Sequence, residues 1–266
     1  PHAHGYAPTP EGNLALGLDL QTLTGNIKFN MALGERLTGI AGVQAQYQEN
    51  DFSGFEFLLP AFRASNAGGY LYTEFSPSHL FTMSSGIRYD YGHRNIRAHT
   101  EPDYTTPEEG DSILRNPAIH RNFHDFSSSL GFSYYHDIWF DTKLNLGTSF
   151  RMPTAAELAS NGIHHGTFRH ERGDPLLDPE RGVQADLNIT YQNNTLYALL
   201  TPFFSYFDKY IYLAPQAEFS NLPGGGQLYQ YTQHDALFSG FEISTEYSLA
   251  KYWKFETGAE YVWNKN

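Results

Sequence analysis

Apolar and polar residues alternate with a period of two over much of this chain of 266 residues. In residues 183–192, for example, Leu187 and Ile189 fall on one face of an extended strand, while Asp186 and Asn188 fall on the other. Successive side chains of a strand point to opposite faces, so the pattern predicts strands with one apolar and one wet face. The charged residues on the second face indicate that water lies there.

Ten segments show this alternation, and their lengths cluster near the ~9 to 11 residues that a tilted strand needs to cross a bilayer. Strands of soluble proteins more often stop at about 5 or 6 residues. The clearest segments are 140–150, 183–192, 237–249 and 253–263, and the weaker ones are 23–33, 38–48, 66–75, 80–91, 125–136 and 196–207. The sequence therefore predicts an all-β fold, the wall of a transmembrane antiparallel β-barrel, with Phe140, Leu187 and Phe241 facing lipid.

The composition fits a barrel better than a helical membrane protein. Aromatic residues make up 16% of the chain, yet the mean hydropathy is −0.48, and no stretch approaches the ~20 apolar residues of a spanning helix. In a barrel only every second residue meets lipid, which hides an apolar surface in a polar average. The lack of cysteine excludes disulfides and thiolate sites. The net charge of −12 argues against a nucleic-acid partner.

Short and long connections alternate along the chain, which sets two different rims on the predicted barrel. The short ones are Gly34-Glu35-Arg36, residues 76–79, the turn near Asp137, Asn193-Asn194 and Ala250-Lys251; the long ones are 49–65, 92–124, 151–182 and 208–236. Outer-membrane barrels have this asymmetry, with short periplasmic turns and long extracellular loops. We therefore expect the four long segments to lie outside the cell.

Residues 149–180 carry a family resemblance. They contain Phe150-Arg151-Met152-Pro153-Thr154, then Glu157-Leu158, Gly173-Asp174-Pro175-Leu176-Leu177 and Pro179-Glu180, with a strand beginning at Val183. This stretch resembles the signature loop region of TonB-dependent outer-membrane receptors. Residues 86–90 and 203–211 are similar to further stretches of that family.

The resemblance implies a barrel of about 22 strands with a plugged lumen. Residues 1–266 would then be a partial barrel domain in the bacterial outer membrane, without the plug and the coupling box. Coupling to a TonB-type protein would use a missing N-terminal segment that adds itself to the partner's sheet. The chain begins at Pro1 without a signal peptide, so we expect a fragment of a longer exported protein.

A set of charged residues falls in the signature loop: Arg151, Glu157, Arg172, Asp174 and Glu180. We interpret it as a network that fixes the loop, folded partly into the mouth, against the barrel rim, in preference to direct contact with ligand. An arginine that lies in the mouth needs a carboxylate partner, because an unpaired charge is costly where water is restricted. No motif of a catalytic triad is present, so an enzyme is not expected.

Histidines gather in or beside the predicted long loops, and His164, His165 and His170 form the densest group. Neutral imidazole ligates Zn and haem iron, so the three are candidates for a metal or haem-iron site. Adjacent residues of an extended chain point to opposite faces, so a shared ion would need a turn, which Gly162 or Gly166 could supply. The alternative is that these histidines are ordinary polar loop residues.

These features predict a receptor that takes up a scarce nutrient, with a metal ion, a metal chelate such as a siderophore, or haem as the preferred cargo and no resident cofactor required. Loop aromatics such as Phe52, Phe57 and Phe219 would either stack on that cargo or pack the loops together, and packing is favoured. Two alternatives remain: a non-transporting outer-membrane barrel that serves as an adhesin or scaffold, and a soluble β-rich binding protein.

Overall fold

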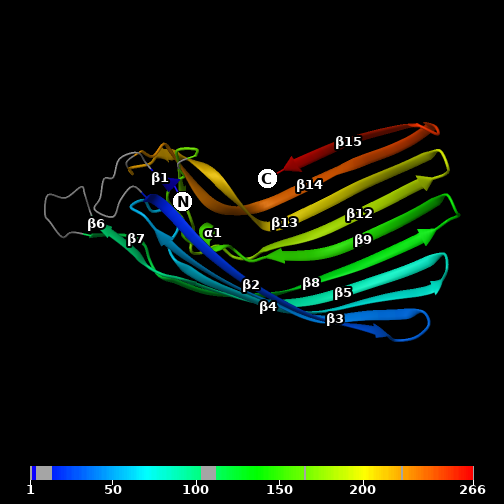
Figure 1. Cartoon of the computed structure of the whole chain (residues 1–266), viewed down its shortest axis with the longest axis horizontal. Coiled ribbons are helices and arrows are strands. Elements are labelled where there is room, and N and C mark those ends of the chain that lie inside the picture. Colours follow the sequence, from blue (N-terminus) through cyan, green and yellow to red (C-terminus); the bar gives the residue numbers. More distant parts are fainter. Residues whose placement is uncertain (1, 4–13, 103–111, 165, 223, 266) are drawn as a thin grey trace.

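The computed structural model describes residues 2–3, 14–102, 112–164, 166–222 and 224–265. A single curved antiparallel sheet dominates it (Figure 1). Its ten long strands are β2 (Leu14–Ala32), β3 (Leu37–Ser53), β4 (Phe62–Ser78), β5 (Phe81–Ile96), β8 (Ile119–Tyr135), β9 (Phe140–Arg151), β12 (Glu180–Gln192), β13 (Leu196–Phe219), β14 (Gln227–Ala250) and β15 (Trp253–Lys265). Each pairs with the next in that order, as a wall built from consecutive hairpins requires.

Short elements lie at the end of the sheet where the long connections are (Figure 1). They are β1 (His2–Ala3), which pairs with β2, the hairpin of β6 (His99–Pro102) and β7 (Ser112–Asn116), the helix α1 (Ala155–Ala159), and the hairpin of β10 (Asn161–His164) and β11 (Arg169–Arg172). β11 also pairs in parallel with the start of β14. In the described part of the chain no helix is both long and apolar enough to span a membrane.

The ten segments that alternate in the sequence are all strands, so the predicted fold class is confirmed. Most strands continue past the predicted segments, chiefly toward the loop side, and the connection predicted over 208–236 shrinks to residues 220–226 because β13 and β14 have 24 residues each. Beyond the bilayer both faces of a strand meet water or other loops, so the apolar alternation fades there although the backbone ladder continues.

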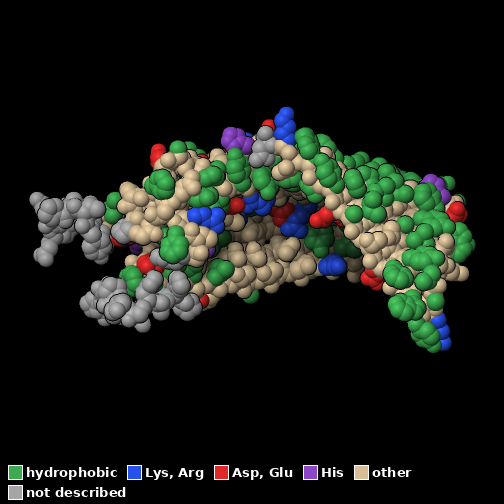
Figure 2. Space-filling model, turned by 90° about the horizontal axis from the view of Figure 1, so that it is seen from above, with side chains coloured by type: hydrophobic (Ala, Val, Ile, Leu, Met, Phe, Trp, Pro, Cys, Tyr) green, Lys and Arg blue, Asp and Glu red, His purple; other side chains and the backbone are tan. Residues whose placement is uncertain are grey.

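The register places apolar residues on one face of the sheet and polar residues on the other. Leu187 lies opposite Leu144, while its neighbour Asp186 lies opposite Asn145, whose Nδ2 donates to the Asp186 carboxylate at 2.8 Å. Figure 2 shows hydrophobic side chains over the outer surface and charged ones within the hollow. Phe255, on the apolar face, is 54% exposed. Such exposure of a large apolar side chain is expected where the side chain faces lipid.

Tyrosines mark where the apolar band ends on the loop side. The Tyr47 hydroxyl donates to Glu49 at 3.0 Å, and the Tyr91 hydroxyl donates to Asn122 at 2.9 Å. Tyrosine rings of membrane proteins favour the interface, where the ring is apolar and the hydroxyl is wet. Trp253, 65% exposed, marks the other rim beside the turn that joins β14 and β15.

Replacing Leu187 with Arg is expected to destabilise the barrel by about 2 to 4 kcal/mol, because the charge would enter hydrocarbon near the bilayer midplane. The measurement is the free energy of folding into lipid vesicles. Asn188→Arg is the matched control, since Asn188 is next in β12 but lies on the polar face, where water and Asp186 can receive the charge. Equal losses in the two variants would contradict the assignment of faces.

Candidate functional site: the loop-side mouth

The segment of residues 152–179, called here the mouth segment, leaves β9 and lies against the concave face of the sheet before β12 begins. Arg121, on the concave face of β8, donates to the main-chain oxygen of Leu177 at 3.1 Å and also to that of Pro175. Figure 1 shows α1, which belongs to this segment, inside the curve of the sheet. The loop predicted to fold into the mouth does so.

The helix α1 is held by a capping box at its first turn. The Thr154 hydroxyl accepts from the Glu157 N–H at 3.2 Å, and the Glu157 carboxylate accepts from the Thr154 N–H at 2.8 Å. This exchange satisfies two main-chain donors that the helix leaves free. The Thr154 and Glu157 of the signature loop therefore start a helical turn at a fixed place in the mouth.

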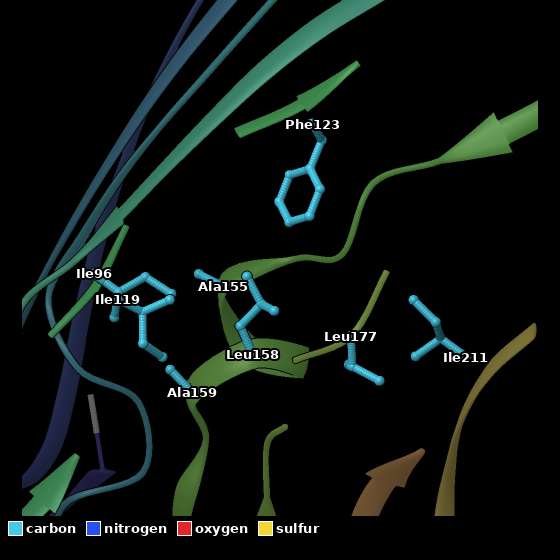
Figure 3. Close-up of a cluster of buried hydrophobic side chains, with 8 residues drawn as sticks. All are labelled: Ile96, Ile119, Phe123, Ala155, Leu158, Ala159, Leu177 and Ile211. Carbon is cyan, nitrogen blue, oxygen red and sulfur yellow. The ribbon is translucent and has the colours of Figure 1, made fainter. Parts of the chain in front are cut away.

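A dry cluster forms where this helix meets the wall, and Figure 3 shows its eight side chains. Ile96 and Ile119, which lie opposite each other on the concave face of β5 and β8, supply the wall, and Leu158 of the helix is 1% exposed. The members of this mouth cluster are Ile96, Ile119, Phe123, Ala155, Leu158, Ala159, Leu177 and Ile211. Their burial fixes the mouth segment to the wall through the hydrophobic effect.

An ion-pair network, called here the rim network, ties both ends of the mouth segment together. Arg151 contacts Glu157 at 2.8 Å and Glu180 at 3.2 Å, and the Glu180 carboxylate also accepts from the Ile211 N–H at 2.9 Å. Burial by itself would lower the pKa of Arg151, but the charges and hydrogen bonds of the two carboxylates outweigh it, so the pKa is raised. The pairing expected for Arg151 is present.

Arg172 and Asp174, grouped with these residues from the sequence, have other contacts. Arg172 donates to the side-chain oxygen of Gln230 at 2.6 Å rather than to a carboxylate, because the parallel pairing of β11 with β14 puts these two residues opposite each other. The Asp174 carboxylate accepts from the Leu176 N–H at 2.8 Å and shapes the local turn. In the described contacts Arg172 is therefore paired with an amide and not with a carboxylate of the rim network.

Gly173 lets the segment return across the end of α1. Its N–H donates to the Ser160 oxygen at 2.7 Å, and a Cβ at this position would lie 2.4 Å from the main-chain nitrogen of Ala159. Any side chain would therefore push the two backbones apart. The Gly-Asp pair of the signature stretch is explained by this close approach and the turn that follows it.

A second anchor of the mouth segment was not anticipated from the sequence. Asp178 contacts Lys209 at 2.7 Å and Arg121 at 3.5 Å, and the Lys209 hydrogen bond lowers the pKa of the Asp178 carboxyl. Lys209 lies at an irregularity of the pairing of β13 with β14 and has a φ of 57°. A bulge of this kind changes the direction in which a side chain points. The sequence gives no local signal of this bulge beyond the Asp208-Lys209 pair between aromatic residues.

His170 is buried, 6% exposed, and both of its ring nitrogens are in hydrogen-bond contact. Nε2 lies 2.9 Å from Asn161 Oδ1 and Nδ1 lies 3.0 Å from Ser220 Oγ. Burial chiefly, with the charges of Arg115 and Arg172, lowers its pKa to about 4. A neutral imidazole between two hydrogen-bonding partners holds loops together, a role that the sequence did not indicate.

These contacts extend into a chain that joins three loops, and we call Arg115, Asn161, His170 and Ser220 the loop latch. Arg115 donates to the Asn161 oxygen at 2.6 Å and pairs with Glu101 at 2.7 Å. The latch thus connects the β6–β7 hairpin, the β10–β11 hairpin and the turn after β13. Buried polar groups that are fully hydrogen-bonded specify one arrangement of the elements that carry them.

His164 and His170, two of the three histidines proposed for a metal site, do not share a face in the described structure. Ile163 lies opposite His170 in the β10–β11 pairing, so His164 is on the other face of that hairpin, exposed, with Nδ1 3.1 Å from Thr167 Oγ1. His165 lies outside the described residues. Among the residues that are described, no group of three or more His, Cys, Asp or Glu could hold a metal ion.

Two of the loop aromatics named from the sequence, Phe52 and Phe57, pack within the protein. Phe57 stacks on His99 with ring centroids 4.1 Å apart, and Phe52 meets the same imidazole edge-on at 4.8 Å. Burial lowers the pKa of His99. A further loop aromatic, Tyr231, packs against the mouth cluster.

Two exposed phenylalanines lie at the outermost loops together with a half-buried pair of Arg169 and Tyr229, and we call Phe168, Arg169, Phe219 and Tyr229 the tip patch. Phe168 is 65% exposed with a φ of 54°, and Phe219 is 79% exposed. Arg169 lies over the Tyr229 ring at 5.1 Å. The backbones that carry the two phenylalanines are linked through neighbouring residues, because the Gly226 N–H donates to the Phe168 oxygen and Gln227 pairs with Phe219. An exposed aromatic side chain in the left-handed region is costly and is typical of functional sites.

Comparison with known proteins identifies the architecture. A family model described as "TonB dependent receptor-like, beta-barrel" matches residues 4–266. Among solved structures, the copper transporter OprC is similar with a TM-score of 0.77 at 18% identity, over 94% of this chain and 39% of that one. A double mutant of the Serratia marcescens hemophore receptor HasR, in complex with its hemophore HasA and heme, has a TM-score of 0.72 at 18% identity, over 94% of this chain and 42% of that one.

The alcaligin receptor FauA from Bordetella pertussis is similar with a TM-score of 0.60 at 15% identity, over 94% of this chain and 39% of that one. The chain thus spans about two fifths of the length of these structures. At such identities the likeness shows the fold. No curated protein sequence matches the chain.

Replacing Glu180 with Gln is expected to loosen the mouth segment, because Arg151 would lose one of its two carboxylates. Losing a hydrogen bond to a charged group typically costs about 1.5 to 3 kcal/mol. Hydrogen exchange of the α1 amides is therefore expected to speed up by roughly tenfold or more. Glu74→Gln, at the turn side of β4, is the control and should leave those amides unchanged. Equal exchange in the two variants would exclude the rim network as an anchor.

The loop latch is expected to weaken as the pH falls. The pKa of His170 is about 4 in the closed arrangement and near its ordinary value of 6.5 once the loops open, so between these values the open form binds a proton that the closed form does not. The contribution of His170 to the stability of the closed loops is thus constant above about pH 6.5 and falls from there toward pH 4. Hydrogen exchange of β10 and β11, corrected for intrinsic rates, measures this. In a His170→Gln variant that pH dependence should disappear; its persistence would assign the effect to another group.

Proposed function

Because this chain belongs to the TonB-dependent receptor-like β-barrel family, we propose that it forms the loop-bearing wall of an outer-membrane receptor that imports a metal chelate or haem. Members of that family are outer-membrane barrels and receptors rather than enzymes. Transport by the complete receptor would be coupled to a TonB-type protein. The chain itself contributes barrel wall and loops to this activity.

The observation that carries the choice of cargo is the tip patch. It combines exposed aromatic rings with an arginine, the groups that bind a flat or aromatic anion through stacking and charge. Haem with its propionates and a catechol-type chelate both have this chemistry. The patch is presented by hairpins that the loop latch holds, and a pre-organised surface loses less entropy when it binds.

The names of the similar proteins support a metal-bearing cargo as a class. They name copper, haem with a hemophore, and the siderophore alcaligin for three different proteins. Copper as a bare ion would call for a convergent set of metal ligands. The tip patch favours the larger ligands, in which the metal is already enclosed.

The proposal is tested by ligand binding to the complete receptor that contains this chain. Calorimetry with haem and with a panel of ferric siderophores, including catecholates and hydroxamates, is expected to find a ligand that binds the wild type. Phe168→Ala together with Phe219→Ala should weaken that binding about tenfold, since each aromatic contact contributes about 0.5 to 1.5 kcal/mol beyond its buried area.

The control for this experiment is Phe126→Ala. Phe126 is similarly exposed, at 61%, but it lies in β8 within the wall rather than at the tips. Its loss should not change the affinity. If haem and all the chelates fail to bind the wild type, the cargo proposal is wrong and the adhesin or scaffold alternative gains support. If they bind but the tip variants bind as well as the wild type, the tip patch is not the contact surface.

A further inference from the structure

The loop-side half of β8 has a free edge. β8 begins at Ile119, but its pairing with β9 starts only at Ser129, which lies opposite Gly147. On its other side β8 pairs with β5 from Ile119 onward. Figure 1 shows β8 continuing toward β7 past the point where β9 turns away to α1. In the described structure, residues 119–128 therefore have a paired strand on one side only.

The main-chain groups of the even-numbered residues of β8 point to this free edge. The N–H of Tyr135, at an odd position, donates to the Leu80 oxygen on the β5 side at 2.8 Å, whereas the N–H of Ser128 donates to the Thr148 hydroxyl of β9 at 2.9 Å. Main-chain groups of successive residues point to opposite sides of a strand. The residues above the membrane whose main-chain groups face the free edge are therefore His120, Asn122 and His124.

Within the membrane, side chains replace the missing strand at this edge. The Ser128 N–H is satisfied by the Thr148 hydroxyl, and the Phe126 N–H donates to the carboxylate of Asp125 at 2.8 Å. Hydrocarbon offers no other partner for such groups, so an edge inside the bilayer has to be satisfied by the protein itself. The two contacts therefore close the lower part of the edge.

Above the membrane the edge is left open. Tyr91, which marks the interface, lies opposite His124, so residues 119–124 lie on the loop side in water. Among the described residues, no hydrogen bond reaches the main-chain groups of His120, Asn122 or His124 at this edge. A row of unpaired main-chain groups is a template for a further strand, and the stretch contains neither proline nor lysine, which proteins place on edges to prevent such pairing.

Contacts on both faces hold this stretch of β8 in place. On the inner face Ile119 and Phe123 are buried in the mouth cluster. On the outer face the side-chain oxygen of Asn122 accepts from the Tyr91 hydroxyl at 2.9 Å and lies 2.7 Å from His93 Nδ1. A rigid edge loses little conformational entropy when a strand pairs with it.

Two side chains beside the free edge define the chemistry of an incoming strand. Arg181 of β12 is 57% exposed, and its Nε contacts Asp125, while no described residue bonds its Nη1 and Nη2 atoms. Leu176 is 78% exposed and lies in sequence between the two residues of the mouth segment whose oxygens accept from Arg121 of β8. A carboxylate would pair with Arg181, and an apolar side chain would cover Leu176.

We propose that residues 119–124 of β8 bind an extended segment of a second protein at the cell surface, which pairs with the free edge as an added strand. In such pairing the main-chain hydrogen bonds supply the affinity and alternate side chains supply the selectivity. The added strand carries a carboxylate at the end next to Arg181 and an apolar side chain toward Leu176. The contact is independent of the cargo, because no residue of the tip patch lies in β8.

The test uses the complete receptor that contains this chain, in detergent, with a labelled synthetic peptide of alternating threonine and valine that ends in glutamate. Fluorescence anisotropy is expected to show saturable binding of this peptide. The same peptide with methyl groups on two adjacent main-chain nitrogens at its centre should not bind, because both of its edges have then lost a donor. Failure of the first peptide to bind, or equal binding of the two, would overturn the proposal.

Asn122→Pro tests the edge itself. Proline removes the Asn122 N–H from the free edge and leaves the hydrogen bonds to β5, which come from the odd-numbered residues. We expect about tenfold weaker peptide binding, since a ring replaces a donor in the middle of the edge. Asn122→Ala loses the same side chain but keeps the N–H, so it is the matched control and should bind as the wild type does. Equal binding by the two variants would contradict strand addition.

Disulfide trapping gives a second readout that does not depend on the proline variant. This chain has no cysteine of its own. A peptide with a single cysteine at one end should be trapped by only one of the variants His120→Cys and His124→Cys, because a paired strand has one direction and one register. Equal trapping by both would overturn the proposal. A receptor dimer that Asn122→Pro abolishes, without any binding of the peptide, would overturn it in favour of a second copy of this chain.

Discussion

The main-chain hydrogen bonds of the sheet are the constraint on which the other features of this protein depend. Hydrocarbon offers no partner for an N–H or C=O group, so a strand that crosses a membrane must pair along its whole length with its neighbours. Consecutive hairpins from β2 to β15 meet this requirement through continuous pairing of neighbouring strands, with irregularities only toward the strand ends and at the bulge in β13. That register then fixes which side chains face lipid and which face the lumen. A slip of one residue would move every side chain of a strand to the opposite face of the sheet.

The mouth follows from the same register. Ile96 and Ile119 are apolar residues on a face that is otherwise polar, and they lie opposite each other where the strands leave the membrane. They give α1 an apolar surface to pack on, while Arg151 and Glu180 hold the two ends of the mouth segment at neighbouring positions of β9 and β12. The mouth cluster stabilises the mouth segment by burying apolar side chains, and the ion pairs of the rim network fix where its ends lie. A segment of this length inside the lumen is stable because both are present.

The contacts among the loops decide which loop residues are free to contact a ligand. His170, Asn161 and Arg115 are occupied with one another, and Phe57 and His99 are stacked. The polar and aromatic residues of the loops therefore form two groups. One group makes contacts that hold the loops together, and the other is exposed at the loop tips. Phe168 and Phe219 belong to the second kind, and the strained backbone of Phe168 persists because the surrounding hydrogen bonds fix it.

The sequence by itself determined the strands, their lipid-facing residues, the two unlike rims and the family, since each of these is written in a period of two or in a local motif. It also grouped Arg151 with Glu157 and Glu180, because a charge in a restricted mouth needs a partner. It could not determine that His164 and His170 point apart, that Arg172 meets Gln230, or that Lys209 reaches Asp178. Those contacts depend on the pairing of the β10–β11 hairpin with β14 and on a bulge in β13, and such long-range pairings leave no local pattern in the chain.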